Sequence, residues 1–256
     1  MGEDQARVLR RALRKTLREE ERFLSRKEER PAWKEAVEGK VPEQLHATLD
    51  LAFQKAFRLV FLQGSGLIER TIPEEKLRRG FAEAAQPDGG RPARKGLGRM
   101  KASASRGSLG GTALATASGL GMGLAGLGLP DIPLLTAVLL RGIYRAGACY
   151  GFSWREPREK LFALGVIRAA LAPDAAERDA AFRALGEPAG ELEEEIRRTA
   201  AVLSQALLLE KFIQGIPLVG AAGGLVNNRA CSRVFRLAAI QYRKRYLRER
   251  LAALEG

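Results

Sequence analysis

The chain has 256 residues, a formal net charge of +13 and a hydrophobic content of 46%, with a mean hydropathy of -0.17. This composition is typical of a soluble or peripheral protein and excludes a polytopic membrane protein. The positive charge favours anionic partners: lipid headgroups, nucleic acid or acidic protein. Cys149 and Cys231 lie far apart on apolar stretches, which predicts buried, reduced thiols. The N-terminus is dense in Arg and Glu and lacks an apolar segment, so we expect a cytoplasmic chain without a secretory signal.

Residues 4–30 are predicted to form an exposed amphipathic helix. Leu9, Leu13 and Leu17 are spaced four apart, and most of the other residues are Arg or Glu. Residues 1–30 contain ten basic and seven acidic residues, a local excess of only +3. We therefore expect this helix to dock on a partner or on the body of the protein rather than to bind DNA. Accordingly, residues 1–30 are predicted to be an N-terminal helical extension and residues 31–256 one helical domain.

A second helix is predicted to begin at Pro42 and to end at Gly64, with an apolar stripe that includes Phe53 and Phe57. A third helix is predicted over 73–85, because Pro73 suits a first helical turn.

Residues 86–108 are predicted to be a basic linker, because Pro and Gly at 87–92 interrupt any helix. Between residues 76 and 107 there are nine basic and two acidic residues, a local charge of +7. We expect five of the basic side chains to contact an anionic surface. They are Arg91, Arg94, Lys95, Arg99 and Lys101.

Residues 107–140 carry a single charge, Asp131, in a chain in which 29% of residues are charged. Small residues recur four apart and share one helical face; they include Gly111, Ala115, Gly119 and Gly123. Such a face allows close helix packing, in a protein core or in a membrane, and the sequence leaves both alternatives open. The segment is interrupted by prolines at 130 and 133 and continues as a helix over 133–150, so we predict a helical hairpin.

The C-terminal half is predicted to contain four more helices. They cover residues 157–171, after a capping box formed by Ser153 and Glu156, then 174–185, 189–213 with an acidic start, and 217–251. The last helix begins with small residues, Gly220 and Gly224, and ends with a basic segment. No stretch alternates with a period of two between hairpin turns. The predicted fold class is therefore all-α, a multi-helix bundle with a glycine-rich helical hairpin.

The order of several short motifs resembles the EcsC family. They are Pro31–Trp33, Gly128–Pro133, Arg141–Ile143, Cys149–Phe152, Glu159–Leu164, Gln214–Asn227 and Tyr242–Arg248. The resemblance covers residues 31–250, so residues 1–30 and the basic segment near 86–106 are expected to be additions to the family pattern. It implies a helical fold. Because the family takes its name from a protein encoded beside an ABC transporter, it also raises a transporter as a membrane-bound partner. It implies no reaction.

The sequence offers few residues for catalysis. His46 is the only histidine, which excludes a histidine metal cluster, and we expect it at the surface or at a helix start rather than in a catalytic site. No phosphate-binding loop motif occurs, and we predict no cofactor and no metal. Asp131 is expected to be the N-cap of the helix that begins near Pro133, or to pair with an arginine or asparagine. Asn227 and Asn228 are expected to make hydrogen bonds between helices.

Three functions are compatible with these features. The leading hypothesis is a non-enzymatic, cytoplasmic protein that associates peripherally with the membrane and with a membrane-bound partner there. The second is a soluble bundle that binds a lipid or another hydrophobic ligand in a cavity lined by glycines. The third is an enzyme that uses Asp131 together with Arg or Asn. Nucleic-acid binding is disfavoured, because the basic residues are dispersed among three segments with few aromatic neighbours.

Overall fold

The computed structural model describes residues 2–25, 43–62, 72–85, 93–106, 131–214 and 229–255. Within these ranges every regular element is an α-helix, which confirms the predicted all-α bundle. The helices are α1 (Gly2–Leu24), α3 (Glu43–Leu62), α5 (Glu74–Ala85), α6 (Ala93–Arg106), α8 (Asp131–Ala148), α9 (Pro157–Leu171), α10 (Ala175–Ala184), α11 (Leu192–Gln214) and α12 (Arg229–Glu255).

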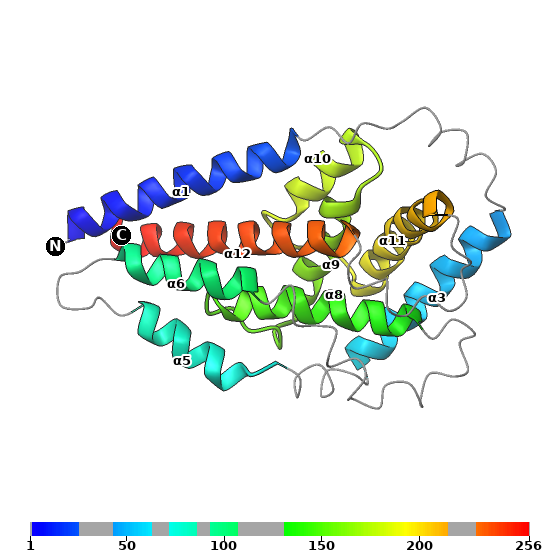
Figure 1. The fold of residues 1–256 in the computed structure, drawn as a ribbon, viewed down its shortest axis with the longest axis horizontal. Helices are drawn as coiled ribbons and strands as arrows, with labels where there is room; N and C mark the ends of the chain where they lie inside the picture. The colour runs from blue at the N-terminus through cyan, green and yellow to red at the C-terminus, as the bar shows by residue number, and fades with distance from the viewer. Residues whose placement is uncertain are drawn as a thin grey trace.

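The longest of the described helices, α12, runs through the middle of the bundle (Figure 1). Its 27 residues span about 40 Å at the helical rise of 1.5 Å per residue. It packs against α1, α6, α8 and α9, whereas α3 and α11 pack against each other at the far end of the bundle. The two chain ends lie together at the opposite end, where Arg10 donates a 2.8 Å hydrogen bond to Glu255.

The core is densest around α9. Every residue from Phe162 to Leu171 is buried, as expected for a helix that is apolar on all sides and surrounded by other helices. In α3 the predicted stripe is confirmed, since Phe53 and Phe57 are fully buried. Cys149 and Cys231 are buried and neither forms a disulfide. None of the described helices is long and apolar enough to cross a membrane.

The ends of the helices show which of the capping signals in the sequence are used in the structure. Gly151 ends α8 with a φ of +87°, and the Phe152 N–H donates to the Gly147 carbonyl at 3.1 Å, the hydrogen bond of a Schellman motif. The predicted capping box at Ser153 is wrong, because the N-cap of α9 is Glu156 and no side chain caps it. Asp174 caps α10 by accepting from the Glu177 N–H at 2.8 Å.

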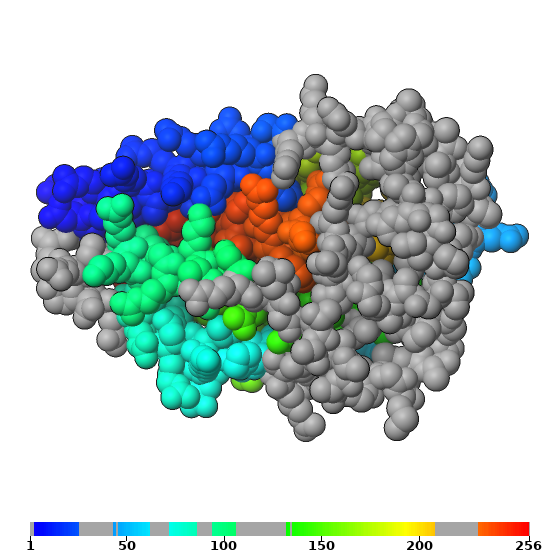
Figure 2. Space-filling model, in the orientation of Figure 1, coloured from blue at the N-terminus to red at the C-terminus, as the bar shows by residue number. Residues whose placement is uncertain are grey.

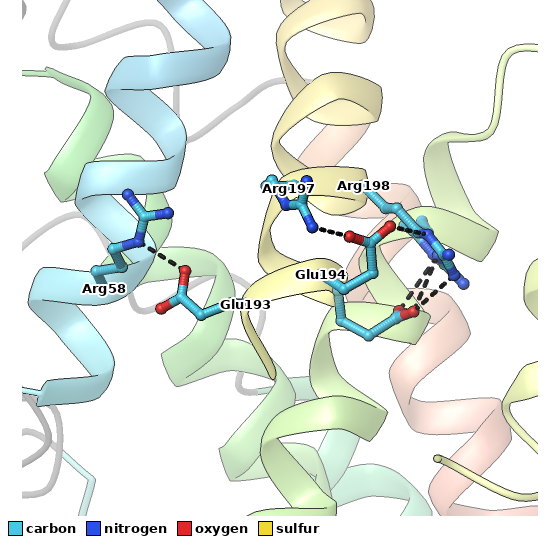
Figure 3. Close-up of polar contacts among 7 residues, drawn as sticks. Arg58, Glu193, Glu194, Arg197 and Arg198 are labelled. Atoms are coloured by element: carbon cyan, nitrogen blue, oxygen red, sulfur yellow. Dashed lines mark hydrogen bonds and ion pairs between the residues drawn. The ribbon is translucent and has the colours of Figure 1, made fainter. Parts of the chain in front are cut away.

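The acidic start predicted for α11 is confirmed and ties this helix to α3 (Figure 3). Glu193 accepts a 2.8 Å hydrogen bond from Arg58 of α3. Glu194 lies between Arg197 and Arg198 of its own helix and bonds to both. These carboxylates also suit the positive end of the helix dipole.

The N-terminal helix docks on the body of the protein. It packs along α12, and its buried face contains Ala6, Leu9, Thr16 and Phe23. Leu17, which the leucine spacing placed in the apolar stripe, is 37% exposed, because the docking face follows a 3.6-residue period rather than strict steps of four.

The basic segment predicted to be a linker contains a helix, α6, over most of its length. A Cβ atom added at Gly96 would lie 1.9 Å from the Ala84 carbonyl oxygen of α5. The absence of a side chain at Gly96 therefore lets α5 and α6 approach closely. Tertiary packing outweighs the low helix propensity of this glycine-containing sequence.

Candidate anion-binding groove

The outer face of α1 carries five arginines at helical spacing, Arg7, Arg11, Arg14, Arg18 and Arg22. Steps of four, three, four and four residues place them along one side of the helix over about 22 Å. All five are exposed and lie on the side opposite the docking face. We call this set the arginine stripe.

The side of α1 between the arginine stripe and the docking face points toward α6. Lys15 and Glu19 lie on this side of α1, and the apolar side chains of Val8 and Ala12 lie on the same side beneath them. On α6, Arg94, Leu97, Gly98 and Lys101 follow one another at steps of three, one and three, and face α1. The two helices therefore enclose a groove with a narrow apolar floor.

This groove has a volume of about 1020 Å³ and is strongly basic. Figure 2 shows the side chains of α1 and α6 on its two sides, with α12 between them. Glu19 is the only carboxylate among the described residues that line it. Its basic lining residues are Arg7, Arg11, Arg14, Lys15, Arg18, Arg22, Arg94, Lys101 and Arg243.

Glu19 joins the three helices that meet at the groove. Its carboxylate accepts a 2.8 Å hydrogen bond from Lys101 of α6 and another from Arg243 of α12. Burial alone raises the pKa of Glu19, but the hydrogen bonds and positive charges of Lys101 and Arg243 outweigh burial and hold the pKa below its ordinary value. Glu19 is therefore ionised at neutral pH. The neighbouring Glu20 bonds to Gln241 at 2.6 Å and to Lys244.

Most of the positive charge in the groove has no counter-charge among the residues that the structure describes. Glu19 neutralises part of the charge of Lys101 and Arg243, and Arg7 pairs with Asp4 at 2.7 Å. The remaining basic lining residues form no ion pair with a described carboxylate; they are Arg11, Arg14, Lys15, Arg18, Arg22 and Arg94. Clustered charges of one sign in a concave surface concentrate counter-ions there, so the groove has the electrostatics of an anion-binding site.

The anionic-surface residues predicted from the sequence fall into three groups. Arg94 and Lys101 line the groove. Lys95 and Arg99 are exposed on an adjacent side of α6. Arg91 lies outside the described residues.

The arginine stripe was not predicted from the sequence, because only the net charge of residues 1–30 as a whole was considered. All the acidic residues that the structure describes in α1 lie at positions 3, 4 and 19–21, whereas the six charged residues from 5 to 18 are all basic. A search for charged residues at helical spacing would have found the stripe.

The other predicted site residues contribute little to this picture. The helix expected to begin near Pro133 begins at Asp131 itself, so the backbone of Asp131 belongs to the first turn rather than preceding it; its side chain lies outside the described residues. His46 lies near the start of α3, as expected. The following predicted residues lie outside the described ranges: Gly111, Ala115, Gly119, Gly123, Gly220, Gly224, Asn227 and Asn228.

A second charged cluster, on the far side of α12, is built around a buried carboxylate. Glu159 of α9 is 1% exposed and accepts hydrogen bonds from the Tyr242 hydroxyl at 2.8 Å and from Arg245 at 2.7 Å. The Arg245 guanidinium also lies over the rings of Phe152 and Phe162, at 4.2 and 4.3 Å from their centroids. We call this the Glu159 cluster. Among the described residues no group of three or more His, Cys, Asp or Glu side chains could hold a metal ion.

The comparison with known families identifies one match. The pattern of the EcsC protein family matches residues 3–247. The match begins at residue 3 rather than at residue 31, so it includes α1, which the resemblance had placed outside the family pattern. No curated protein and no solved structure matches the chain significantly.

Proposed function

The chain belongs to the EcsC family, and we propose that it is a non-enzymatic, cytoplasmic protein that binds the anionic surface of a membrane through the basic groove and meets a membrane-bound partner there. The observation that supports this proposal is the excess of positive charge on α1 and α6. Each Lys or Arg near an anionic lipid surface contributes roughly 1 kcal/mol to binding. The groove and the exposed Lys95 and Arg99 present such charges together.

The sequence that follows α6 adds to this support. Residues 107–130, which come directly after Arg106, carry no charged side chain. A basic segment beside an uncharged apolar segment is the pattern of chains that meet a bilayer at its headgroups. A groove with a single carboxylate, itself paired with two cations, does not favour acid-base catalysis, which uses a carboxylate with access to substrate.

The proposal is tested by flotation of the full chain with lipid vesicles. We expect binding to vesicles that contain phosphatidylglycerol, no binding to pure phosphatidylcholine vesicles, and release from the anionic vesicles as salt is raised, because salt screens charges at exposed sites. Equal flotation with both vesicle types, or binding that salt does not weaken, would contradict an electrostatic surface contact.

A variant locates the contact on α6. Replacing Arg94, Lys95 and Arg99 with Gln should weaken binding to anionic vesicles by roughly 3 kcal/mol at low salt. Lys101 is left intact because it bonds to Glu19. The matched control replaces three exposed arginines elsewhere, Arg158, Arg183 and Arg197, which removes the same net charge. If both variants lose the same affinity, only the overall charge matters and the α1–α6 groove is not the binding site.

A further inference from the structure

A second pocket, between α6 and α12, adjoins the basic groove, and we call it the inner pocket. This inner pocket has a volume of about 320 Å³, at the lower end of the roughly 300–1,000 Å³ of small-molecule sites. Glu19, Lys101 and Arg243 line both hollows. Beyond them the inner pocket is lined by Arg236 of α12 and by Tyr150, which follows α8.

Tyr150 brings a buried hydroxyl that has no hydrogen-bond partner among the described residues. The residue is 2% exposed, and its hydroxyl makes no hydrogen bond. Burial raises the pKa of Tyr150, and the opposing effect of Arg243 is smaller, so the hydroxyl keeps its proton at neutral pH and can act as a donor. A buried polar group without a partner costs about 1–3 kcal/mol, so this hydroxyl gains from an acceptor that enters the pocket.

Arg243 brings a second donor of the same kind. Its side chain is 7% exposed; its Nη2 bonds to Glu19, whereas its Nε is buried without an acceptor. Lys101 and Arg236 add positive charge to the same pocket, and Glu19 is the one carboxylate among its described lining residues. The pocket thus contains three cations, one anion and two unused donors, which come from the turn after α8 and from α12.

We propose that the inner pocket binds a phosphoryl group, with Tyr150 and Arg243 donating hydrogen bonds to its oxygens and Lys101 and Arg236 balancing its charge. Donors that approach from separate elements suit a tetrahedral anion with several acceptor oxygens better than a planar carboxylate. This inference deepens the proposed function and rests on it for the source of the group, the phosphate of a lipid headgroup at the surface that the basic groove contacts.

The pocket itself is tested without lipid. The melting temperature of the full chain is measured in sodium phosphate and in sodium chloride at equal ionic strength, with inorganic phosphate as the probe. We expect a rise specific to phosphate in the wild-type protein. In Tyr150→Phe the apparent phosphate affinity should fall roughly tenfold or more, because a hydrogen bond to a charged group is lost, while the melting temperature in chloride should not fall, because the hydroxyl has no partner to lose.

Tyr246→Phe is the matched control. The ring of Tyr246 lies 6.0 Å from that of Tyr150, but its hydroxyl bonds to Arg250 and the residue does not line the inner pocket. This variant should keep the phosphate response of the wild type. A wild-type protein that responds equally to phosphate and chloride, or a Tyr150→Phe variant with wild-type phosphate affinity, would overturn the inference.

A vesicle experiment distinguishes the two sources of the phosphoryl group. Vesicles with phosphatidic acid, which exposes a phosphomonoester, are compared with phosphatidylserine vesicles of matched surface potential. A preference for phosphatidic acid that is lost in Tyr150→Phe supports the lipid headgroup as the source of the phosphoryl group. A phosphate response without that preference overturns the lipid source and assigns the pocket to a soluble phosphate ester. Vesicle binding without a phosphate response leaves the proposed function standing and refutes the inner pocket.

Discussion

Arg243 and Arg245 lie two residues apart on α12, yet one faces the basic groove and the other belongs to the Glu159 cluster. Arg245 bonds to a carboxylate that is almost completely buried, and its guanidinium covers two aromatic rings. Its Nη1 lacks a hydrogen-bond acceptor, but the ring faces attract the cation. The charge of Arg245 is therefore satisfied within the fold.

Arg243 is in a different position. It shares Glu19 with Lys101 and lies below a set of cations that have no described counter-charge. Like charges that are brought together by folding repel one another and destabilise the compact state. The charges of the Glu159 cluster are paired within the fold and stabilise it. Most of the charges of the groove have no described counter-charge and are available to a binding partner. The predictions below test this separation.

The largest effect is expected from Glu159→Gln. This change removes a carboxylate whose side chain is 2% exposed and that accepts hydrogen bonds from Arg245 and Tyr242, and removal of one member of a buried ion pair typically costs about 3–5 kcal/mol. The free energy of unfolding, measured with urea, should fall by about that amount. Glu19→Gln should cost less, because the Glu19 side chain is 24% exposed whereas that of Glu159 is 2% exposed, and should strengthen binding to anionic vesicles. Equal losses of stability in the two variants would remove the distinction between the clusters.

Gly96 and Gly98 lie on different faces of α6, so substitutions at these two positions compare how closely each face is packed. Gly96→Ala should destabilise the protein by about 1–3 kcal/mol, because the new methyl group would meet the Ala84 carbonyl and force α5 and α6 apart. Gly98 lines the groove and has open space around it, so Gly98→Ala should stabilise the helix by up to about 1 kcal/mol. Thermal unfolding of both variants checks the signs. A stable Gly96→Ala protein would show that α6 is not closely packed on α5.

A smaller effect is expected from pH. The pKa of Glu19 lies below its ordinary value of 4.5 in the folded protein, so the unfolded chain binds a proton more readily than the folded one. The stability that Glu19 contributes is therefore present above pH 4.5 and is lost as the pH falls through the lowered pKa. The difference in unfolding free energy between the wild type and Glu19→Gln should shrink across this acidic range. A difference that stays constant from pH 7 to pH 3 would show that Glu19 is not held in its charged form by Lys101 and Arg243.

Much of the fold followed from the sequence because helix ends and apolar periodicity are local signals. The stripe of α3 and the acidic start of α11 were both predicted correctly. The helix α6 was not, because its stability depends on contact with α5 at Gly96, which no local pattern reveals. The choice of Ser153 as a cap failed because several polar residues near a helix start can fit the same spacing.

The site was predictable only in part. The basic character of residues 91–101 was recognised, but the groove also requires α1 to lie beside α6, and those helices are separated by more than 65 residues in the chain. The inner pocket depends on Tyr150 and Arg243, whose proximity arises from the packing of α8 and α12. Net charge alone indicates the class of partner, whereas the position of the site comes from tertiary structure.

The central claim is that the arginine stripe serves binding rather than folding. The most direct test measures the dissociation constant for vesicles containing phosphatidylglycerol, at low salt, for a variant with Arg11, Arg14 and Arg18 replaced by Gln. At about 1 kcal/mol per charge, binding should weaken roughly a hundredfold, while the melting temperature stays the same or rises because repulsion is relieved. The variant at Arg158, Arg183 and Arg197 should bind within about threefold of the wild type. Wild-type affinity in the stripe variant, or a loss of affinity that follows from its unfolding, would contradict the claim.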